Sequence, residues 1–298
     1  MSSLATSILD DAPGGRPGDG PDTPEPPDTP DTIDRVFDRI ESESGIDLGI
    51  YDQATLVRRL WTSAGGEGVA TPDALDAWLA SDPAPPSRLT RLVLGLTSRS
   101  APLFSEVALW SALRARVIPL LRTYPSINVW VPGCGAGTMA YALAMVLHEE
   151  GLRERARIYA TDLTEMVLEQ GRSGRLMERM LVGAAAAYAA SGGKASLETY
   201  VMEEEGRQVF APLLRERITF AQHSLATDAS FNEFQFILCR DVLASFEPGV
   251  AQRGYRLLHE SVCRFGIVAL GTRDRPPGGW RDGYEDFDMT HQLFRRIV

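Results

Sequence analysis

The residues best suited to bind a ligand are a glycine-rich turn and an aspartate further along the chain. Gly133, Gly135 and Gly137 follow one apolar run, and Asp162 ends the next. Glycine lets the backbone turn sharply and approach a ligand closely because it has no Cβ. An acidic residue at this place after such a turn can accept hydrogen bonds from ribose hydroxyls. The pattern is typical of a nucleoside site, although an ordinary tight turn between strand and helix also explains the glycines.

Two further turns carry residues that could meet the same ligand. Ser224 and Leu225 follow the third apolar run, and Arg240 and Asp241 follow the fourth. Ligands of open α/β sheets bind beyond the carboxyl ends of the strands, so we expect all four turns to face one site. Arg240 and Asp241 are the candidate catalytic residues, and Arg240 is also a candidate for binding the cofactor.

The glycine turn favours a mononucleoside over a dinucleotide or a nucleoside triphosphate. It does not end in Lys-Ser or Lys-Thr, as a P-loop does. Threonine at position 138 and alanine at position 140 leave the dinucleotide pattern Gly-x-Gly-x-x-Gly incomplete. S-adenosylmethionine is the common cofactor that fits a mononucleoside turn. Cys134, Thr138 and Leu163 complete the list of expected cofactor contacts.

Composition and charge exclude several classes of protein. The chain has 298 residues, of which 44% are hydrophobic, enough for a sizeable core. Its net charge of −10 argues against general nucleic-acid binding, which needs a basic surface. Three widely spaced cysteines make neither a zinc motif nor a disulfide framework, so we expect no metal. We also expect no membrane insertion and a cytoplasmic protein, because no long apolar run or secretory pattern is present.

Short apolar runs alternate with helical patterns through residues 98–298. This alternation predicts an α/β fold with a Rossmann-like, mostly parallel sheet. We expect residues 172–216 to be mostly helical, Thr164 to cap a helix, and residues 292–298 to be able to add a last strand. The five expected strands are residues 127–131, 156–161, 218–221, 234–239 and 265–270.

The chain before this α/β domain divides into two parts. Residues 1–32 are rich in Pro, Gly and Asp and predict a disordered tail, because they cannot bury enough apolar surface to offset the entropy of ordering. Residues 33–97 carry four helical patterns and predict a small helical domain. Arg58 and Arg59 are expected to point outward from its second helix. They form either a docking surface for an acidic partner or a plain solvated face.

The glycine turn and its flanks resemble the chemotaxis-receptor methyltransferases, the CheR family. That family carries Trp-x-x-Gly-Cys-x-x-Gly-Glu-Glu-Pro-Tyr-Ser-Leu-Ala-Met. Eight of its residue types recur in this chain, in Trp130-Val-Pro-Gly-Cys-Gly-Ala-Gly-Thr-Met-Ala-Tyr-Ala-Leu-Ala-Met145. Two later family motifs recur in the same order, as Ala160-Thr-Asp-Leu163 with Leu168-Glu-Gln-Gly-Arg-Ser-Gly174, and as Cys239-Arg-Asp-Val-Leu-Ala-Ser-Phe246. The resemblance covers roughly residues 35–298.

The resemblance implies a helical N-terminal domain followed by a Rossmann-like methyltransferase domain that uses S-adenosylmethionine. It implies transfer of the cofactor's methyl group to glutamate side chains of a chemoreceptor-like protein. The carboxylate is already a nucleophile and the sulfonium is already activated, so alignment and desolvation would supply most of the rate. Neither a metal nor a catalytic triad is needed.

The chain departs from the family where the methionine end of the cofactor is expected. Ser105 stands where the family has the arginine expected to bind the cofactor's carboxylate, and Arg99 and Arg240 are the candidates to replace it. Thr138 and Met139 replace two glutamates, and Ser245 replaces a tyrosine. Two main hypotheses remain: an active protein-glutamate methyltransferase with altered cofactor contacts, or a non-catalytic CheR-like binding or regulatory module. Methylation of a small molecule is a third.

Overall fold

The computed structural model describes residues 30–81, 88–97 and 101–298. Its first helix begins at Pro30 and so includes the last three residues of the predicted tail. The rest of the predicted tail and Arg99 lie outside the described residues. No helix among the described residues is long and apolar enough to cross a membrane.

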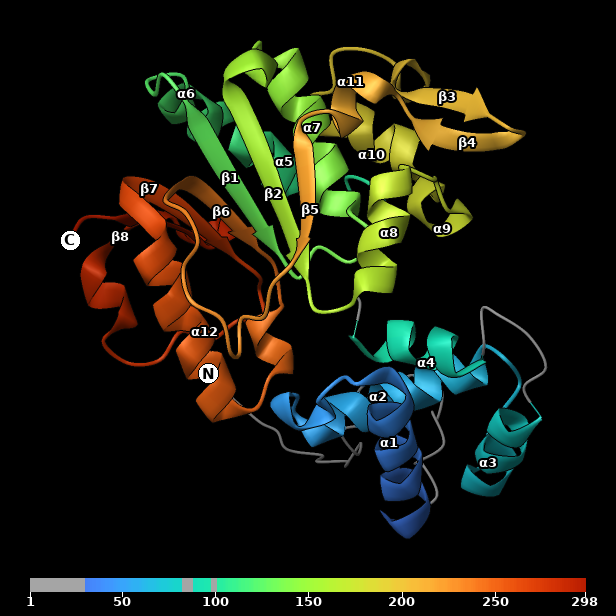
Figure 1. Ribbon diagram of the computed structural model, residues 1–298. Helices are drawn as coiled ribbons and strands as arrows, with labels where there is room; N and C mark the ends of the chain where they lie inside the picture. Colours follow the sequence, from blue (N-terminus) through green and yellow to red (C-terminus); the bar gives the residue numbers. More distant parts are fainter. Residues whose placement is uncertain (1–29, 82–87, 98–100) are drawn as a thin grey trace, which may run out of the picture.

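The predicted helical domain is present at the N-terminal side of the chain (Figure 1). Asp52 caps its second α-helix by accepting from the Thr55 N–H at 2.8 Å, and Thr71 caps the third by accepting from the Ala74 N–H at 3.2 Å. Such caps satisfy backbone donors that a helix leaves unpaired at its first turn. The elements are α1 (Pro30–Ser44), η1 (Leu48–Ile50), α2 (Gln53–Gly65), α3 (Pro72–Ala80) and α4 (Arg88–Thr97).

The α/β domain is built on a seven-stranded sheet with the order β5-β2-β1-β6-β7-β9-β8. The first five of these strands are parallel, and β9 and β8 are antiparallel. The chain leaves β1 toward β2 on one side and returns to β6 on the other, so the switch point of the fold lies between β1 and β6. The strands are β1 (Ile127–Pro132), β2 (Ala156–Asp162), β5 (Ile218–Gln222), β6 (Phe234–Cys239), β7 (Val262–Leu270), β8 (Tyr284–Asp288) and β9 (Leu293–Arg296).

Alternation along β1 divides the core between the two faces of the sheet. Successive side chains of a strand point to opposite faces. Val129 and Val131 pack into the cluster that contains the buried residues of α7 (Thr138–Glu149), whereas Trp130 packs into the cluster that contains α12 (Pro248–Ser261). The second cluster also includes the core of the helical domain, so the two domains share one continuous apolar core.

Helices connect the strands and cover the sheet as expected. Before β1, α5 (Val107–Ala112) runs through a π-helical turn (Leu113–Val117) into α6 (Ile118–Leu121). Beyond β2, α8 (Glu165–Ser173) packs against β2 and β5. Thr164 occupies the N-cap position of α8, but its side chain makes no capping hydrogen bond.

The prediction for residues 172–216 is wrong in part. Three short α-helices and the 3-10 helix η4 (Leu197–Tyr200) are present, but β3 (Val201–Glu204) and β4 (Arg207–Phe210) form an antiparallel hairpin, at the upper right of Figure 1. Its two-residue turn, Glu205 and Gly206, has positive φ at both positions, +52° and +72°, which suits the twist of a hairpin. The Asn-Gly pair that usually marks such a hairpin turn is absent from the sequence. The strand β8 was also not predicted from the sequence. The helices are α9 (Glu178–Leu181), α10 (Ala184–Ala190) and α11 (Pro212–Arg215).

Candidate functional site

The carboxyl ends of β1, β2, β5 and β6 meet beside the helical domain (Figure 1). Two adjoining cavities lie there, with volumes of about 50 and 80 Å³. The first, which we call the Asp162 cavity, is lined by the predicted residues Gly133, Asp162, Leu163, Leu225, Arg240 and Asp241. The second, the Ser105 cavity, is lined by Ser105, Gly133, Cys134, Thr138, Met139, Arg240 and Asp241.

Both cavities are smaller than the roughly 300–1,000 Å³ of most small-molecule sites. A nucleoside with an amino-acid tail therefore needs the lining residues to move apart. Gly133, Arg240, Asp241 and Val242 line both cavities and separate them. Three of these four residues, Arg240, Asp241 and Val242, belong to the turn after β6.

Two glycines of the turn allow close packing of neighbouring side chains. A Cβ on Gly133 would lie 2.7 Å from Val242 Cγ2, and one on Gly137 would lie 2.7 Å from the Phe220 ring. Both have positive φ, +61° and +86°, which other residues rarely adopt. Gly133 lines both cavities, but Gly137 lines neither. Gly137 therefore allows the start of α7 to pack closely against Phe220 of β5, and it has no contact with either cavity.

Asp162 ties the end of β2 to the glycine turn. Its Oδ2 accepts from the Gly135 N–H at 2.9 Å, and its Oδ1 accepts from the Leu163 N–H at 2.8 Å and the Thr164 N–H at 3.4 Å. A carboxylate offers about four acceptor positions, so one is left for a ligand hydroxyl. Burial raises the pKa of Asp162, and the three hydrogen bonds, which act to lower the pKa, offset only part of this effect. The carboxyl group can therefore accept a hydrogen bond from a ribose hydroxyl while it also holds the glycine turn in place. Gly135 lines neither cavity, and its part in the site is the hydrogen bond to Asp162.

The residues after β5 divide between two cavities. Leu225 is buried in the Asp162 cavity, but Ser224 is not part of it. The Ser224 hydroxyl accepts from the Ala226 and Thr227 N–H groups at 3.2 Å each, which makes it a cap of its own turn. Ser224 instead lines a larger cavity between the two domains, as does Leu163.

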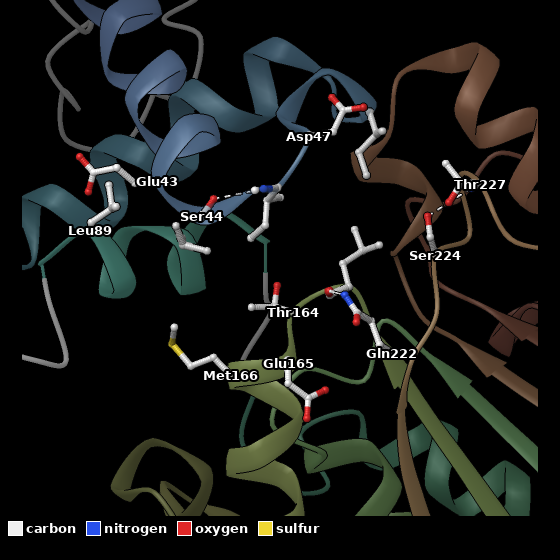
Figure 2. Close-up of a pocket in the computed structure, with 15 residues that line it drawn as sticks. Glu43, Ser44, Asp47, Leu89, Thr164, Glu165, Met166, Gln222, Ser224 and Thr227 are labelled. Atoms are coloured by element: carbon white, nitrogen blue, oxygen red, sulfur yellow. Dashed lines mark hydrogen bonds between the residues drawn. The ribbon is translucent and has the colours of Figure 1, made fainter.

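That interdomain cavity has a volume of about 660 Å³. Figure 2 shows Thr164 and Met166, at the start of α8, facing Ser44 and Leu89 of the helical domain. Its lining includes Leu163, which also borders the Asp162 cavity, but none of the glycine turn. The interdomain cavity therefore adjoins the candidate site rather than containing it.

Arg240 lies between the Asp162 and Ser105 cavities and is bonded to protein groups. Its Nη2 pairs with Glu106 Oε2, and its Nε donates to Glu106 Oε1 at 3.4 Å. Its Nη1 donates to the carbonyl oxygens of Leu270 and His291, the latter at 3.2 Å. Only 9% of Arg240 is exposed. Arg240 therefore ties the ends of β6 and β7 to Glu106, the residue before α5.

Asp241, the other candidate catalytic residue, is held by the turn after β7. It has a positive φ of +55°, and its Oδ1 accepts from the Arg273 N–H at 2.8 Å. Its own N–H donates to Asp274 Oδ2 at 2.8 Å. Asp274 also accepts from the N–H groups of Gly271, at 2.7 Å, and Ala244, at 2.9 Å. Asp274 is almost fully buried, and burial raises its pKa against these bonds.

Sequence reasoning missed Asp274 and Tyr51. Asp274 follows β7, so the strand-end rule applied to the fifth strand would have found it. His223 lines the Asp162 cavity, with its ring edge-on to Trp130 and its Nε2 3.0 Å from the Ala229 carbonyl oxygen. Tyr51 reaches the same cavity from the helical domain, and no local pattern could have placed it there.

The prediction that Arg59 points outward is wrong. Its side chain lines the Asp162 cavity and donates to the Leu96 carbonyl oxygen at 2.5 Å. The helical pattern of α2 placed it outward because the second domain that covers this face was not visible in the local sequence. Arg58 is exposed, as expected.

The helical domain is fixed to the site by backbone hydrogen bonds. The Asp52 N–H donates to the Ser245 carbonyl oxygen, and the Glu247 N–H donates to the Ile50 carbonyl oxygen, both at 3.0 Å. Tyr51 packs edge-on against Phe246 with 5.4 Å between ring centroids. Ser245, where the family has tyrosine, thus belongs to the joint between the domains.

The fold is Rossmann-like, and the candidate site residues line a cavity at the carboxyl ends of its parallel strands. The model of the CheR methyltransferase SAM-binding domain matches residues 100–292. The chain therefore belongs to the CheR methyltransferase family. The matched domain binds S-adenosyl-L-methionine, so the predictions of family, fold class and cofactor are confirmed.

Two relatives are similar to this chain over most of their own length. A Pseudomonas putida protein named "Putative methyltransferase Cher3" is 33% identical over 84% of this chain and 91% of its own. A Listeria monocytogenes chemotaxis protein methyltransferase is 24% identical over 78% of this chain and 85% of its own. The solved glycopeptide N-methyltransferase MtfA with S-adenosylmethionine is only a remote likeness. It covers 59% of this chain and 56% of its own at 16% identity, with a TM-score of 0.33.

Proposed function

We propose that the protein transfers the methyl group of S-adenosylmethionine to glutamate carboxylates of a chemoreceptor-like protein. The observation that supports this most directly is the Asp162 carboxylate, bonded to the glycine turn and lining a cavity at the switch point of a CheR-family domain. The acceptor class rests on the relatives that are named chemotaxis protein methyltransferases.

The reaction asks little acid–base chemistry of the protein. Bound S-adenosylmethionine would supply the methyl group: a carboxylate oxygen of the acceptor would bond to the methyl carbon as the carbon–sulfur bond breaks, and the electron pair of that bond would stay on sulfur. No proton moves. The chain's contribution is to orient the two reactants and exclude water. Arg240 and Asp241 border both cavities, and we assign them to shaping this position rather than to proton transfer.

Docking of the acceptor is proposed to use the exposed Arg58 on α2. Arg59 is excluded from that surface because it lines the Asp162 cavity. A basic side chain on an acidic protein would favour an acidic partner helix.

Two measurements test the proposal. Calorimetric titration with S-adenosylhomocysteine is expected to show binding, and tritiated S-adenosylmethionine is expected to label a chemoreceptor cytoplasmic fragment. The label should be released by mild base, because a carboxyl methyl ester hydrolyses there. Base-stable label would contradict a glutamate acceptor. The absence of heat at millimolar ligand would support the alternative, a non-catalytic CheR-like module, which Ser105, Thr138 and Met139 favour because each lacks the charge of its family counterpart.

A further inference from the structure

In the Ser105 cavity, the carboxylate of Glu106 is paired with the guanidinium of Arg240. Glu106 bonds two nitrogens of Arg240, and the Leu270 and His291 carbonyl oxygens accept from a third. Four of the five guanidinium N–H groups are used in this way. If Glu106 were absent, a ligand carboxylate could accept hydrogen bonds from these same guanidinium N–H groups.

Within the described part of the chain, the remaining lining of this cavity offers no substitute for Arg240. Among the described residues that line it, Arg240 is the only cation, while Glu106 and Asp241 are both acidic. Ser105, Thr138 and Met139 are uncharged. The cofactor's carboxylate would therefore meet a guanidinium that is already paired with Glu106, and the Glu106 carboxylate would repel it. The second carboxylate, Asp241, is itself paired with Arg273 at 3.7 Å.

We propose that Glu106 is an internal substitute for the cofactor's carboxylate, which limits how tightly this protein binds the amino-acid end of its nucleoside ligand. The ligand class favoured by the site is then a 5′-thioadenosine, with or without the amino-acid tail. This inference rests on the nucleoside site of the proposed function. It predicts that the tail adds almost nothing to affinity while Glu106 is paired with Arg240.

Two ligands separate the tail from the nucleoside. S-adenosylhomocysteine carries the amino-acid tail, whereas 5′-methylthioadenosine lacks it. Calorimetry with the full chain is expected to give dissociation constants for the two ligands within about threefold of each other. In Glu106→Gln, S-adenosylhomocysteine should bind about tenfold more tightly, the scale of one charge-assisted hydrogen bond. Binding of 5′-methylthioadenosine should stay unchanged.

The control variant is Glu154→Gln. Glu154 also pairs with arginines, Arg153 and Arg217, but it is exposed and precedes β2, at the opposite end of the sheet. It should leave the ratio of the two affinities unchanged. Glu106→Ala provides a second variant if Glu106→Gln unfolds, and thermal unfolding reports on each.

The outcomes distinguish this inference from the proposed function. If the unaltered protein binds S-adenosylhomocysteine tenfold more tightly than 5′-methylthioadenosine, or if Glu106→Gln leaves their ratio unchanged, only the inference about Glu106 is overturned. If neither nucleoside binds to any variant, the nucleoside site itself is wrong, and the inference is overturned with the proposed function.

Discussion

The Gly135 N–H donates to the Asp162 carboxylate at 2.9 Å, so the glycine turn and the end of β2 form one hydrogen-bonded unit. Asp162, which the sequence identified as a candidate to bind ribose, thus also stabilises the shape of the glycine turn. Substitution of Asp162 should therefore change both ligand affinity and stability.

Replacing Asp162 by asparagine should weaken binding of 5′-methylthioadenosine at least tenfold. The amide keeps one acceptor oxygen but loses the charge, and its NH₂ group would face a backbone donor from Gly135 or from Leu163. A buried donor left unpaired costs about 1–3 kcal/mol, so the melting temperature should also fall. Calorimetry and thermal unfolding measure the two effects. Unchanged affinity in a folded variant would remove Asp162 from the ligand site.

An arginine at position 105 should restore part of the family's binding to the cofactor's carboxylate. Ser105 lines the same cavity as Thr138 and Met139, where the amino-acid tail is expected. Ser105→Arg is expected to tighten S-adenosylhomocysteine about tenfold and to leave 5′-methylthioadenosine unchanged. Ser105→Gln, long and polar but uncharged, is the matched control. An equal gain for both ligands would show that the tail lies elsewhere.

Gly137 offers a test of packing that is independent of any ligand. Gly137→Ala should destabilise the fold by about 2–4 kcal/mol, because the new Cβ meets the Phe220 ring at a positive φ. Gly151→Ala is the control, since Gly151 has φ +70° but no atom lies within 4 Å of the place that its Cβ would take. The difference between the two variants in urea unfolding measures the steric part. Equal losses would contradict the contact with Phe220.

The sequence predicted the five parallel strands and the residues at their ends because these depend on local patterns. Apolar runs gave β1, β2, β5 and β6, and the strand-end rule placed Asp162 and Leu225 at one site. Residues brought in by tertiary contact were beyond such patterns. Tyr51 and Arg59 reach the cavity only because the helical domain docks on the turn after β6.

The ion pair of Arg240 with Glu106 is another feature that local sequence patterns could not predict. The sequence identified a strand-end arginine that was a candidate to replace the missing arginine at position 105. It could not show that Glu106, 134 positions earlier in the chain, takes up the guanidinium. A motif gives the type and place of a side chain, whereas its availability depends on what packs against it.

Docking through Arg58 can be tested by reversing its charge. Arg58→Glu should weaken association with a chemoreceptor cytoplasmic fragment, and the loss should shrink as salt is raised, because exposed charges are screened. Arg39→Glu, on α1 and paired with Glu43, is the control for a general change of charge. Surface plasmon resonance at several salt concentrations measures both. Association that is insensitive to salt would count against an acidic partner.

Glu149 should make the stability of the protein depend on pH. It is buried, which raises its pKa, but hydrogen bonds from Tyr188 and Arg114 more than offset this, and its pKa is lowered overall. A carboxyl group with a lowered folded-state pKa stabilises the fold above its unfolded pKa of about 4.3. That stabilisation is lost as the pH falls through the lower, folded-state pKa.

Glu149→Gln should therefore flatten the pH dependence of unfolding at acid pH. Urea unfolding at pH 7 should show a loss of about 1–3 kcal/mol, because Tyr188, Tyr200 and Arg114 lose a charged acceptor. As the pH falls below about 5, the variant should lose less stability than the unaltered protein. Glu203→Gln, exposed on β3, should retain the full slope. A Glu149→Gln variant with the unaltered slope would show that this carboxyl group does not titrate with unfolding.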